Sequence, residues 1–295
     1  MNGTAATSRT RGTAAVARPS AVRARRVSRS LFGVCFGLLA LVFFLPMIWM
    51  TLSGFKSNSE IFSDPFALPD SIDLGQWKTA WDVGGLGQYV LNSLVVTAVA
   101  VLAILVLGSA AAYAFSRFDF RGRGALMTVL ALGLLLPLQS YFIAQSTMFT
   151  DLGLTDTRWA LIVPYTAMGL PLATYLLKVY LDALPAELFE AARVDGAGDL
   201  RIFLMIVVPL LKPGLATVAI FSALTSWNEF LLALLYIQDD ALKTIPAGLL
   251  AFTGRHSTDY GLLFSALSII TLPMIVIYVV FNRWVVGGVT AGSLK

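Results

Sequence analysis

The chain has 295 residues, of which 57% are hydrophobic and only 13% are charged. Soluble proteins carry about a quarter charged residues, so this composition excludes an ordinary soluble protein and indicates a membrane protein. The single cysteine, Cys35, excludes an intrachain disulfide, and one cysteine with one histidine cannot form a metal site built on clusters of those residues. We therefore predict no metal site.

The first 30 residues form a basic arm that precedes any apolar segment. They contain seven arginines and no acidic residue, in a chain whose formal net charge is +4. We predict that residues 1–30 are disordered and lie in the cytoplasm as a solvated tail without a specific partner, and contact with anionic membrane lipid is the alternative. The charge indicates orientation in the membrane rather than nucleic-acid binding.

Residues 31–52 are the first of six apolar segments. This uncharged run of 22 residues can cross a hydrocarbon core of about 30 Å at 1.5 Å per residue, and it lacks the cleavage site of a signal peptide. The other five predicted spans are residues 91–115, 125–147, 159–181, 215–237 and 262–281. The sequence thus predicts an all-α integral membrane protein with six transmembrane helices.

The distribution of basic residues predicts the topology. If both termini lie on one side, that side holds sixteen Lys and Arg residues and the other side holds five. The positive-inside rule then places both termini in the cytoplasm of a multi-pass protein of the bacterial cell membrane. With this topology, residues 53–87 form an extracytoplasmic loop and residues 283–295 form a cytoplasmic tail. Residues 88–282 form the transmembrane core, which contains the other five helices.

No motif for catalysis is present. The chain has no GxxxxGK[ST] phosphate-binding loop and no Gly-Lys pair, and it lacks the HExxH and GxSxG patterns of hydrolases. We therefore predict that the chain is not an enzyme, has no catalytic residue and binds no cofactor itself.

Glu229 is the only carboxylate well inside an apolar segment, roughly 20 Å along the fifth predicted span at 1.5 Å per residue. Such a residue marks a functional site by default, so Asn228, Glu229, Ser265 and Ser268 are candidates for lining a translocation pathway. The alternative is that these polar side chains hold helices together. A proton-coupled carrier that uses Glu229 is a further alternative.

The segment from residue 182 to residue 213 is more ordered than a simple connection requires. Pro185 opens a predicted helix with Glu187 and Glu190 near its start, and Gly196 permits the positive φ of a sharp turn. A second short helix is predicted from Asp199 to Val208, before Pro209. A helix, a turn and a second helix on the cytoplasmic side form an element suited to docking against another protein.

This segment resembles the EAA motif of ABC importer permeases. Glu190-Ala191-Ala192 is followed after three residues by Gly196 and after nine more by IVVP, in which Val208 departs from the motif's leucine. The fuller string EAARVDGA, with the blocks GLTDT, LIVPY, SWNEF, TIPAGL and GGVTAGSLK, is similar to permeases of the carbohydrate-uptake, maltose-transporter type. The resemblance covers about residues 91–295 and implies the type I ABC importer fold.

The resemblance implies a function and a set of partners. The chain would move a mono- or oligosaccharide, or as an alternative another small solute, together with a second permease subunit, two ATPase subunits that bind ATP and Mg, and an extracytoplasmic sugar-binding protein. Contact with the binding protein falls on Thr244, Pro246 and Gly248. Coupling to the ATPase falls on Glu187, Glu190, Ala191, Ala192, Asp195, Gly196, Phe203 and Pro209.

Overall fold

The computed structural model describes residues 19–82, 84–137, 140–254, 258–272 and 274–275, with side chains from residue 32 onward. Most of residues 1–30 and all of the tail at 283–295 therefore lie outside the description. Residues 19–30, predicted to be disordered, instead begin helix α1 (Pro19–Ser53). The chain falls into two units, residues 1–50 and 51–295. In the first unit, the apolar side chains from Phe32 to Leu45 are exposed.

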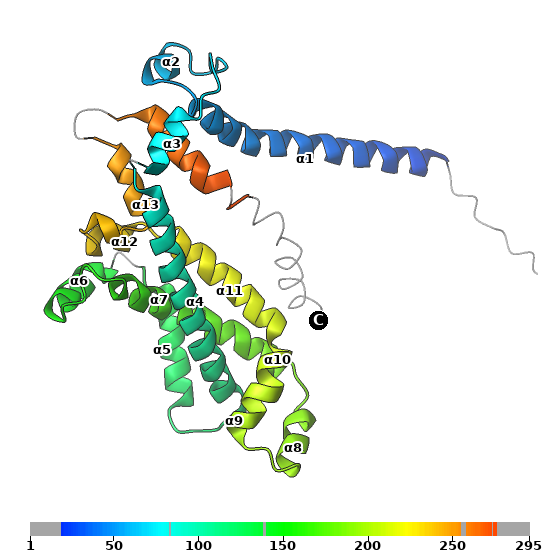
Figure 1. Cartoon of the computed structure of the whole chain (residues 1–295). Coiled ribbons are helices and arrows are strands. Elements are labelled where there is room, and N and C mark those ends of the chain that lie inside the picture. The colour runs from blue at the N-terminus through cyan, green and yellow to red at the C-terminus, as the bar shows by residue number, and fades with distance from the viewer. Residues whose placement is uncertain (1–18, 83, 138–139, 255–257, 273, 276–295) are drawn as a thin grey trace, which may run out of the picture. The chain divides into compact units, whose positions relative to one another are not determined.

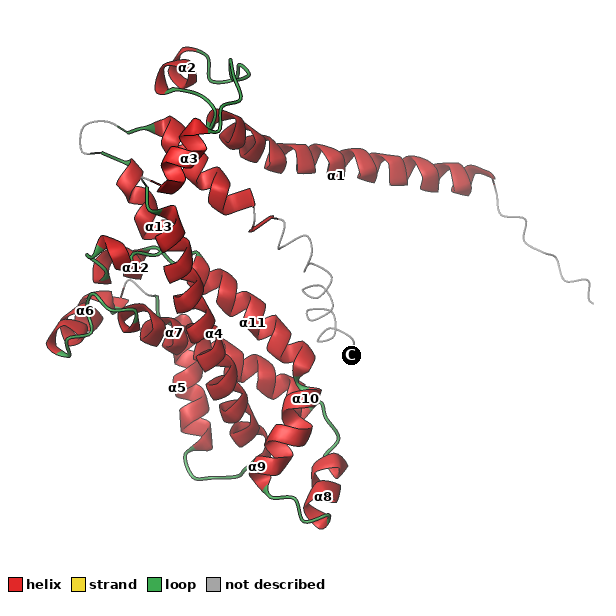
Figure 2. Ribbon diagram, in the orientation of Figure 1, coloured by secondary structure: helices red, strands yellow, loops and turns green. Residues whose placement is uncertain are grey.

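The second unit is helical, apart from one isolated bridge between Thr253 and Thr258 in its described part (Figure 2). Its α-helices are α2 (Asn58–Ser63), α3 (Gly75–Asp82), α4 (Leu86–Arg117), α5 (Arg123–Leu135), α6 (Phe142–Asp151), α7 (Trp159–Asp182), α8 (Glu187–Val194), α9 (Asp199–Ile202), α10 (Val208–Leu210), α11 (Lys212–Trp227), α12 (Leu231–Tyr236) and α13 (Ile245–Gly248). An unlabelled apolar helix covers Tyr260–Leu272. A wider π-helix, η2, covers Phe203–Val207, and the tighter 3₁₀-helices are η3 (Asp240–Leu242) and η4 (Leu249–Phe252).

Helices α4, α7 and α11 form the centre of the second unit, and Figure 1 shows α8 and α9 at the opposite end from α12 and α13. Small residues bring α4 and α7 together: a Cβ on Gly108 would lie 2.9 Å from the Cβ of Ala173, and one on Gly169 would lie 2.4 Å from Cδ1 of Ile104. Such close approach is typical of helices that pack within a membrane. The buried side chains at this contact include Ile104, Ala173 and Leu177.

Three described helices are long and apolar enough to cross a membrane, namely Phe32–Ser53, Leu86–Arg117 and Trp159–Asp182. A fourth span results if Asp199–Leu210 and Lys212–Trp227, which meet at 75°, count as one. Shorter apolar helices cover Arg123–Leu135 and Tyr260–Leu272. The six continuous spans of the prediction are thus not all present in the described residues.

The third predicted span, residues 125–147, is interrupted. Helix α5 ends at Leu135, Leu136 is extended with φ −77° and ψ 117°, and α6 begins only at Phe142. The residue before a proline avoids the helical region, so Pro137 explains the break. The predicted loop at residues 53–87 is also more ordered than expected, because it contains α2 and α3 and ends in the first residues of α4.

The fifth predicted span, residues 215–237, is also interrupted. Helix α11 ends at Trp227 and α12 begins at Leu231, so Glu229 lies in the break and not inside a continuous helix. The Asn228 side chain donates to the carbonyl of Leu224 at 2.8 Å, and the Asn228 amide donates to the same carbonyl at 3.2 Å. Local hydrogen bonding by a side chain thus adds to the last helical hydrogen bond of α11.

Candidate functional site

Helix α8 and the turn after it form as the sequence predicts. Gly196 has φ +80°, its amide donates to Arg193, and the Ala197 amide donates to the carbonyl of Ala192 at 2.9 Å. These two bonds with a left-handed residue form a Schellman motif, which closes a helix and is favoured by glycine. The turn is also held by an ion pair between Arg193 and Asp199 at 3.2 Å.

The second helix of this segment is longer than predicted. It was expected to end at Val208, but helical structure runs from Asp199 through η2 and α10 to Leu210, with Pro209 inside it. Helix η2 is a π-helix, whose wider turns alter the i to i−4 pattern that a proline would otherwise break. Pro209 therefore does not end the helix.

The residues predicted to couple to an ATPase divide into two groups. Ala192 is buried, at 9% exposed, and packs with Phe189 in the core of its own chain, while Phe203 is partly buried beside them. The Ala192 side chain is therefore directed into the chain itself, although we had expected it to contact a partner. The exposed members are Glu187, Glu190, Ala191, Asp195, Gly196 and Pro209.

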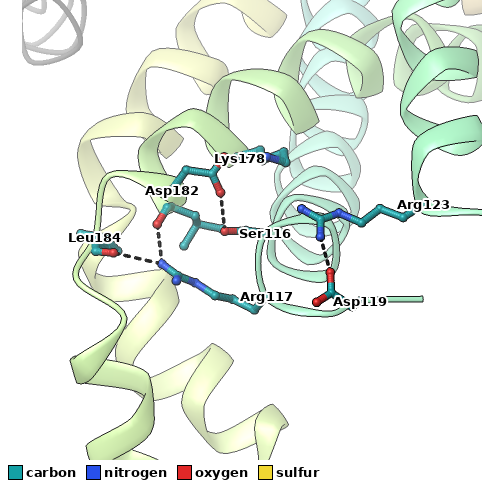
Figure 3. Close-up of polar contacts among 8 residues, drawn as sticks. Ser116, Arg117, Asp119, Arg123, Lys178, Asp182 and Leu184 are labelled. Carbon is teal, nitrogen blue, oxygen red and sulfur yellow. Dashed lines mark hydrogen bonds and ion pairs between the residues drawn. The ribbon is translucent and has the colours of Figure 1, made fainter. Parts of the chain in front are cut away.

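Polar contacts join the end of α4 to the end of α7 and to Leu184 in the segment before α8, as Figure 3 shows. Arg117, the last residue of α4, donates from Nη2 to the carbonyl oxygens of Leu181 and Leu184 at 2.5 and 3.3 Å. Its guanidinium carbon lies 3.9 Å from the centre of the Phe189 ring. Arg117 thus links the ends of α4 and α7 to α8.

A second contact ties the same two helix ends together. The Ser116 hydroxyl donates to Asp182 at 2.7 Å, and Lys178 pairs with the other oxygen of that carboxylate at 2.5 Å. Sequence reasoning used Arg117 and Lys178 only to assign orientation. Ser116 near the end of one apolar segment and Asp182 at the end of another were the available signals for this contact.

Glu229 forms a cap and a contact between helices. Its carboxylate accepts from the amide of Leu232 at 3.0 Å, from that of Ala233 at 3.4 Å, and from the hydroxyl of Tyr165 on α7 at 2.8 Å. A carboxylate at the start of a helix accepts hydrogen bonds from the unpaired amides there and interacts favourably with the helix dipole. Glu229 also lines a cavity of about 180 Å³ between α7 and α11.

The other candidates for a translocation pathway lie elsewhere. Ser265 is fully buried, and its hydroxyl donates to the carbonyls of Gly54 at 2.6 Å and Gly261 at 2.9 Å. Ser268 is also buried and donates to the carbonyl of Phe264 at 2.7 Å. Asn228 donates to a carbonyl of α11, so all three side chains have partners within the chain, and of the three only Ser265 joins two separate segments.

The residues predicted to contact a binding protein lie around α13. Thr244 precedes this helix and is buried, Gly248 ends it and is buried, and Pro246 is partly exposed. A Cβ on Gly248 would lie 2.2 Å from the ring of Tyr89, so glycine permits this packing. Two of the three residues are therefore buried within the chain, which the prediction did not foresee.

Two side chains of α4, which sequence reasoning missed, position this segment. Asn92 is fully buried and donates to the carbonyls of Ala241 and Lys243 at 2.8 and 3.0 Å. The Ser93 hydroxyl accepts from the amide of Ile245 at 2.9 Å. An amide side chain near the start of an apolar segment was the available signal.

Within the described residues, no three His, Cys, Asp or Glu side chains gather as a metal site requires.

Comparison with known proteins identifies the family. Residues 104–290 match the family described as binding-protein-dependent transport system inner membrane component. The diacetylchitobiose uptake system permease protein NgcG of Streptomyces coelicolor is 35% identical over 260 residues, which cover 88% of this chain and 86% of the relative. The trehalose/maltose transport system permease protein MalG of Thermococcus litoralis is 32% identical over 88% of this chain and 94% of the relative.

A solved structure agrees with this family in fold. The chain resembles a protein of a bacterial ABC transporter that imports the acidic polysaccharide alginate, with a TM-score of 0.75 and 23% identity over 88% of this chain and 97% of the other. This likeness confirms the all-α ABC permease fold. Since the family match covers more than half of the sequence, the chain belongs to the binding-protein-dependent transport system inner membrane components and is a multi-pass transport permease, not an enzyme.

Proposed function

We propose that this chain is the membrane-spanning permease subunit of an ATP-binding-cassette importer and moves a mono- or oligosaccharide across the plasma membrane. The observation that carries the proposal is the exposed α8 element with its Schellman turn, attached by Arg117 to the ends of two central helices. The sugars in the relatives' names, diacetylchitobiose and trehalose or maltose, support a saccharide as cargo.

The proposed assembly contains a second permease subunit, two ATPase subunits and an extracytoplasmic sugar-binding protein. ATP and Mg bind to the ATPase subunits, because the chain has no phosphate-binding loop. The excess of basic residues orients α8 toward the cytoplasm, together with both termini. The α13 end then faces outward, toward the binding protein, with Pro246 and Leu250 as its exposed or partly exposed side chains.

Coupling would run through the exposed face of α8. Glu187, Glu190 and Asp195 offer acceptors to donors of the ATPase, and the small side chain of Ala191 permits close approach. Closure of the two ATPase subunits would move α8, and the contacts of Arg117 with α4 and α7 would carry that movement into the spans. Ala192 and Phe203 would act from inside, by fixing α8 on the core.

Reconstitution of the four kinds of subunit in lipid vesicles tests the proposal. We expect uptake of maltose, trehalose or diacetylchitobiose that depends on ATP. Ala191→Trp should abolish uptake while the chain still inserts and assembles, because Ala191 is exposed on α8. Ala125→Trp, an exposed alanine in the first turn of α5, is the matched control and should retain uptake.

Three outcomes would contradict the proposal. Normal uptake by Ala191→Trp would show that α8 does not couple the chain to the ATPase. Uptake driven by a proton gradient without the ATPase subunits would make the chain a secondary carrier. ATP-dependent uptake of a different class of solute, with none of the three sugars transported, would show that the cargo is not a saccharide.

A further inference from the structure

The block GLTDT, residues 153–157, lies in the connection between α6 and α7 and has no part in the function proposed above. Its backbone turns sharply, since Gly153 has φ +65° and Asp156 has φ +55°. Among the described residues, Asp156 is the only residue other than glycine with a positive φ. Such a conformation is costly for a residue with a Cβ, and it persists where surrounding contacts hold it.

Asp156 holds the chain at the point where α12 ends. Its amide donates to the carbonyl of Tyr236, the last residue of α12, at 3.0 Å. Its carboxylate oxygen Oδ1 accepts from the amide of Gln238, and from that of Asp239 at 2.9 Å. Hydrogen bonds to a carboxylate are about twice as strong as neutral ones. Asp156 therefore fixes the beginning of residues 237–244, the α12–α13 loop.

A second connection joins the same loop to the start of α7. Arg158, the N-cap residue of α7, donates from Nη2 to the side-chain oxygen of Asn92 at 3.0 Å. Asn92 in turn donates to the carbonyls of Ala241 and Lys243. The α12–α13 loop is thus attached to the start of α7 at both of its ends, directly at the first and through Asn92 at the second.

Packing beneath the α12–α13 loop joins it to the same helix. Tyr236 is 1% exposed, and its hydroxyl donates to the carbonyl of Phe142 on α6 at 3.1 Å. Tyr236 and Ile237 belong to one buried cluster with Ala160 and Leu161 of the first turn of α7. The start of α7 and the α12–α13 loop therefore form one packed body.

Helix α7 connects this body to the opposite end of the protein, where Asp182, its last residue, bonds to the end of α4. Its 24 residues span about 36 Å at 1.5 Å per residue. Pro171 interrupts the hydrogen bonds of α7, but α4 packs closely against Gly169 and Ala173 on both sides of this proline. A displacement of the α12–α13 loop would therefore move α7 at the end that lies beside α8.

We propose that Asp156 is a positioning residue for transport, which locks the α12–α13 loop to α7 so that movement of the loop by a docked binding protein is passed to the end of α7 beside α8. The inference rests on the proposed function, because the loop leads into α13, which faces the binding protein in that proposal. Asp156 acts through the amides of Gln238 and Asp239.

Two substitutions of Asp156 separate its side-chain bonds from its backbone conformation. Asp156→Gly keeps the left-handed turn, which glycine adopts freely, but removes both bonds. Asp156→Asn keeps an oxygen acceptor at the position of Oδ1, and asparagine also tolerates this conformation. Hydrogen exchange of the Gln238 and Asp239 amides should be roughly tenfold faster in Asp156→Gly, the effect of one lost hydrogen bond to a charged group, and much less changed in Asp156→Asn.

The transport test uses the complete transporter in vesicles with ATP, the binding protein and the sugar that the unchanged complex imports among maltose, trehalose and diacetylchitobiose. Asp156→Gly should import less sugar per ATP hydrolysed, whereas Asp156→Asn should match the unchanged complex. Asp151→Gly is the matched control, because Asp151 is also exposed but its carboxylate has no hydrogen-bond partner among the described residues. It should leave the ratio of sugar to ATP unchanged.

Three results would overturn the inference. The two amides could exchange equally fast in the unchanged chain and in Asp156→Gly, which would show that the side chain does not hold the loop. Faster exchange with an unchanged ratio of sugar to ATP would show that the lock has no role in transport. A ratio as low in Asp156→Asn as in Asp156→Gly would assign the effect to the negative charge. Failure of the unchanged complex to import any of the sugars would instead overturn the proposed function.

Discussion

The guanidinium carbon of Arg117 lies 3.9 Å from the centre of the Phe189 ring, so the last residue of α4 lies directly over the buried side of α8. The same guanidinium donates to the carbonyls of Leu181 and Leu184, beyond which the chain turns toward α8. Arginine suits this place because its planar group stacks on a ring while its fork of donors serves carbonyl oxygens. One side chain therefore connects the two central helices with the element proposed to meet the ATPase.

Replacement of Arg117 should uncouple transport. We expect Arg117→Ala to lose sugar uptake while the assembled complex still hydrolyses ATP, because α8 would remain but its attachment would be weakened by about 1–3 kcal/mol. Arg117→Lys should not restore uptake, since an ammonium group cannot stack and bridge two carbonyls at once. Uptake and ATP hydrolysis are measured on the same vesicles.

Arg123→Ala is the control for this prediction. Arg123 also lies at the cytoplasmic end proposed for the bundle, but its ion pair at 2.6 Å is with Asp119, whose side chain is 98% exposed. Exposed pairs contribute about 0–1 kcal/mol, so the ratio of sugar imported to ATP hydrolysed should not change. An equal loss of this ratio in both variants would show that Arg117 has no special role.

The turn after α8 should depend on glycine at one position only. Both Gly196 and Gly198 have open space where a Cβ would be placed, but only Gly196 has a positive φ, +80° against −72°. Gly196→Ala should therefore destabilise the turn by about 1 kcal/mol, and Gly198→Ala should not. Hydrogen exchange of the amides from Asp195 to Ala197 reports the difference, and equal exchange rates in the two variants would contradict it.

The bond between Tyr165 and Glu229 should stabilise the break in the fifth apolar segment. Glu229→Ala leaves the first amides of α12 without their acceptor and should cost about 1–2 kcal/mol of unfolding free energy. Tyr165→Phe should cost about 1 kcal/mol, for a single hydrogen bond. The double variant should be less destabilised than the sum of the two, as thermal unfolding in detergent would show. Strict additivity would mean that the bond contributes nothing.

Gly248 should resist substitution more strongly than an open glycine. A methyl group at this position would lie 2.2 Å from the ring of buried Tyr89, and overpacking of this kind costs about 1–3 kcal/mol. Gly248→Ala should therefore lower the melting temperature, and Gly124→Ala, with nothing within 4 Å, should not. A Gly248→Ala protein as stable as the parent chain would mean that Tyr89 moves freely.

The sequence predicts the segments whose structure depends on local signals. The predicted span at 159–181 differs from α7 by one residue, and α8 with its turn at Gly196 follows from caps, acids and glycine. Contacts between distant residues were not predictable. Glu229 caps α12 and accepts from Tyr165, 64 residues earlier, so hydropathy alone read the break as one continuous helix. The burial of Ala192 likewise depends on packing against α8's neighbours, which spacing does not reveal.

The segment Asp199–Leu210 meets α11 at an angle of 75° at Leu211, so a rotation at this bend would move the whole segment as a lever arm. Its 12 residues span about 18 Å at 1.5 Å each, so a rotation of only about 10° at the bend would displace the far end by about 3 Å. That far end is Asp199, which pairs with Arg193 of α8. A displacement of α8 by about 3 Å would therefore change the tilt of α11 slightly and would alter the cavity between α7 and α11 that Glu229 lines.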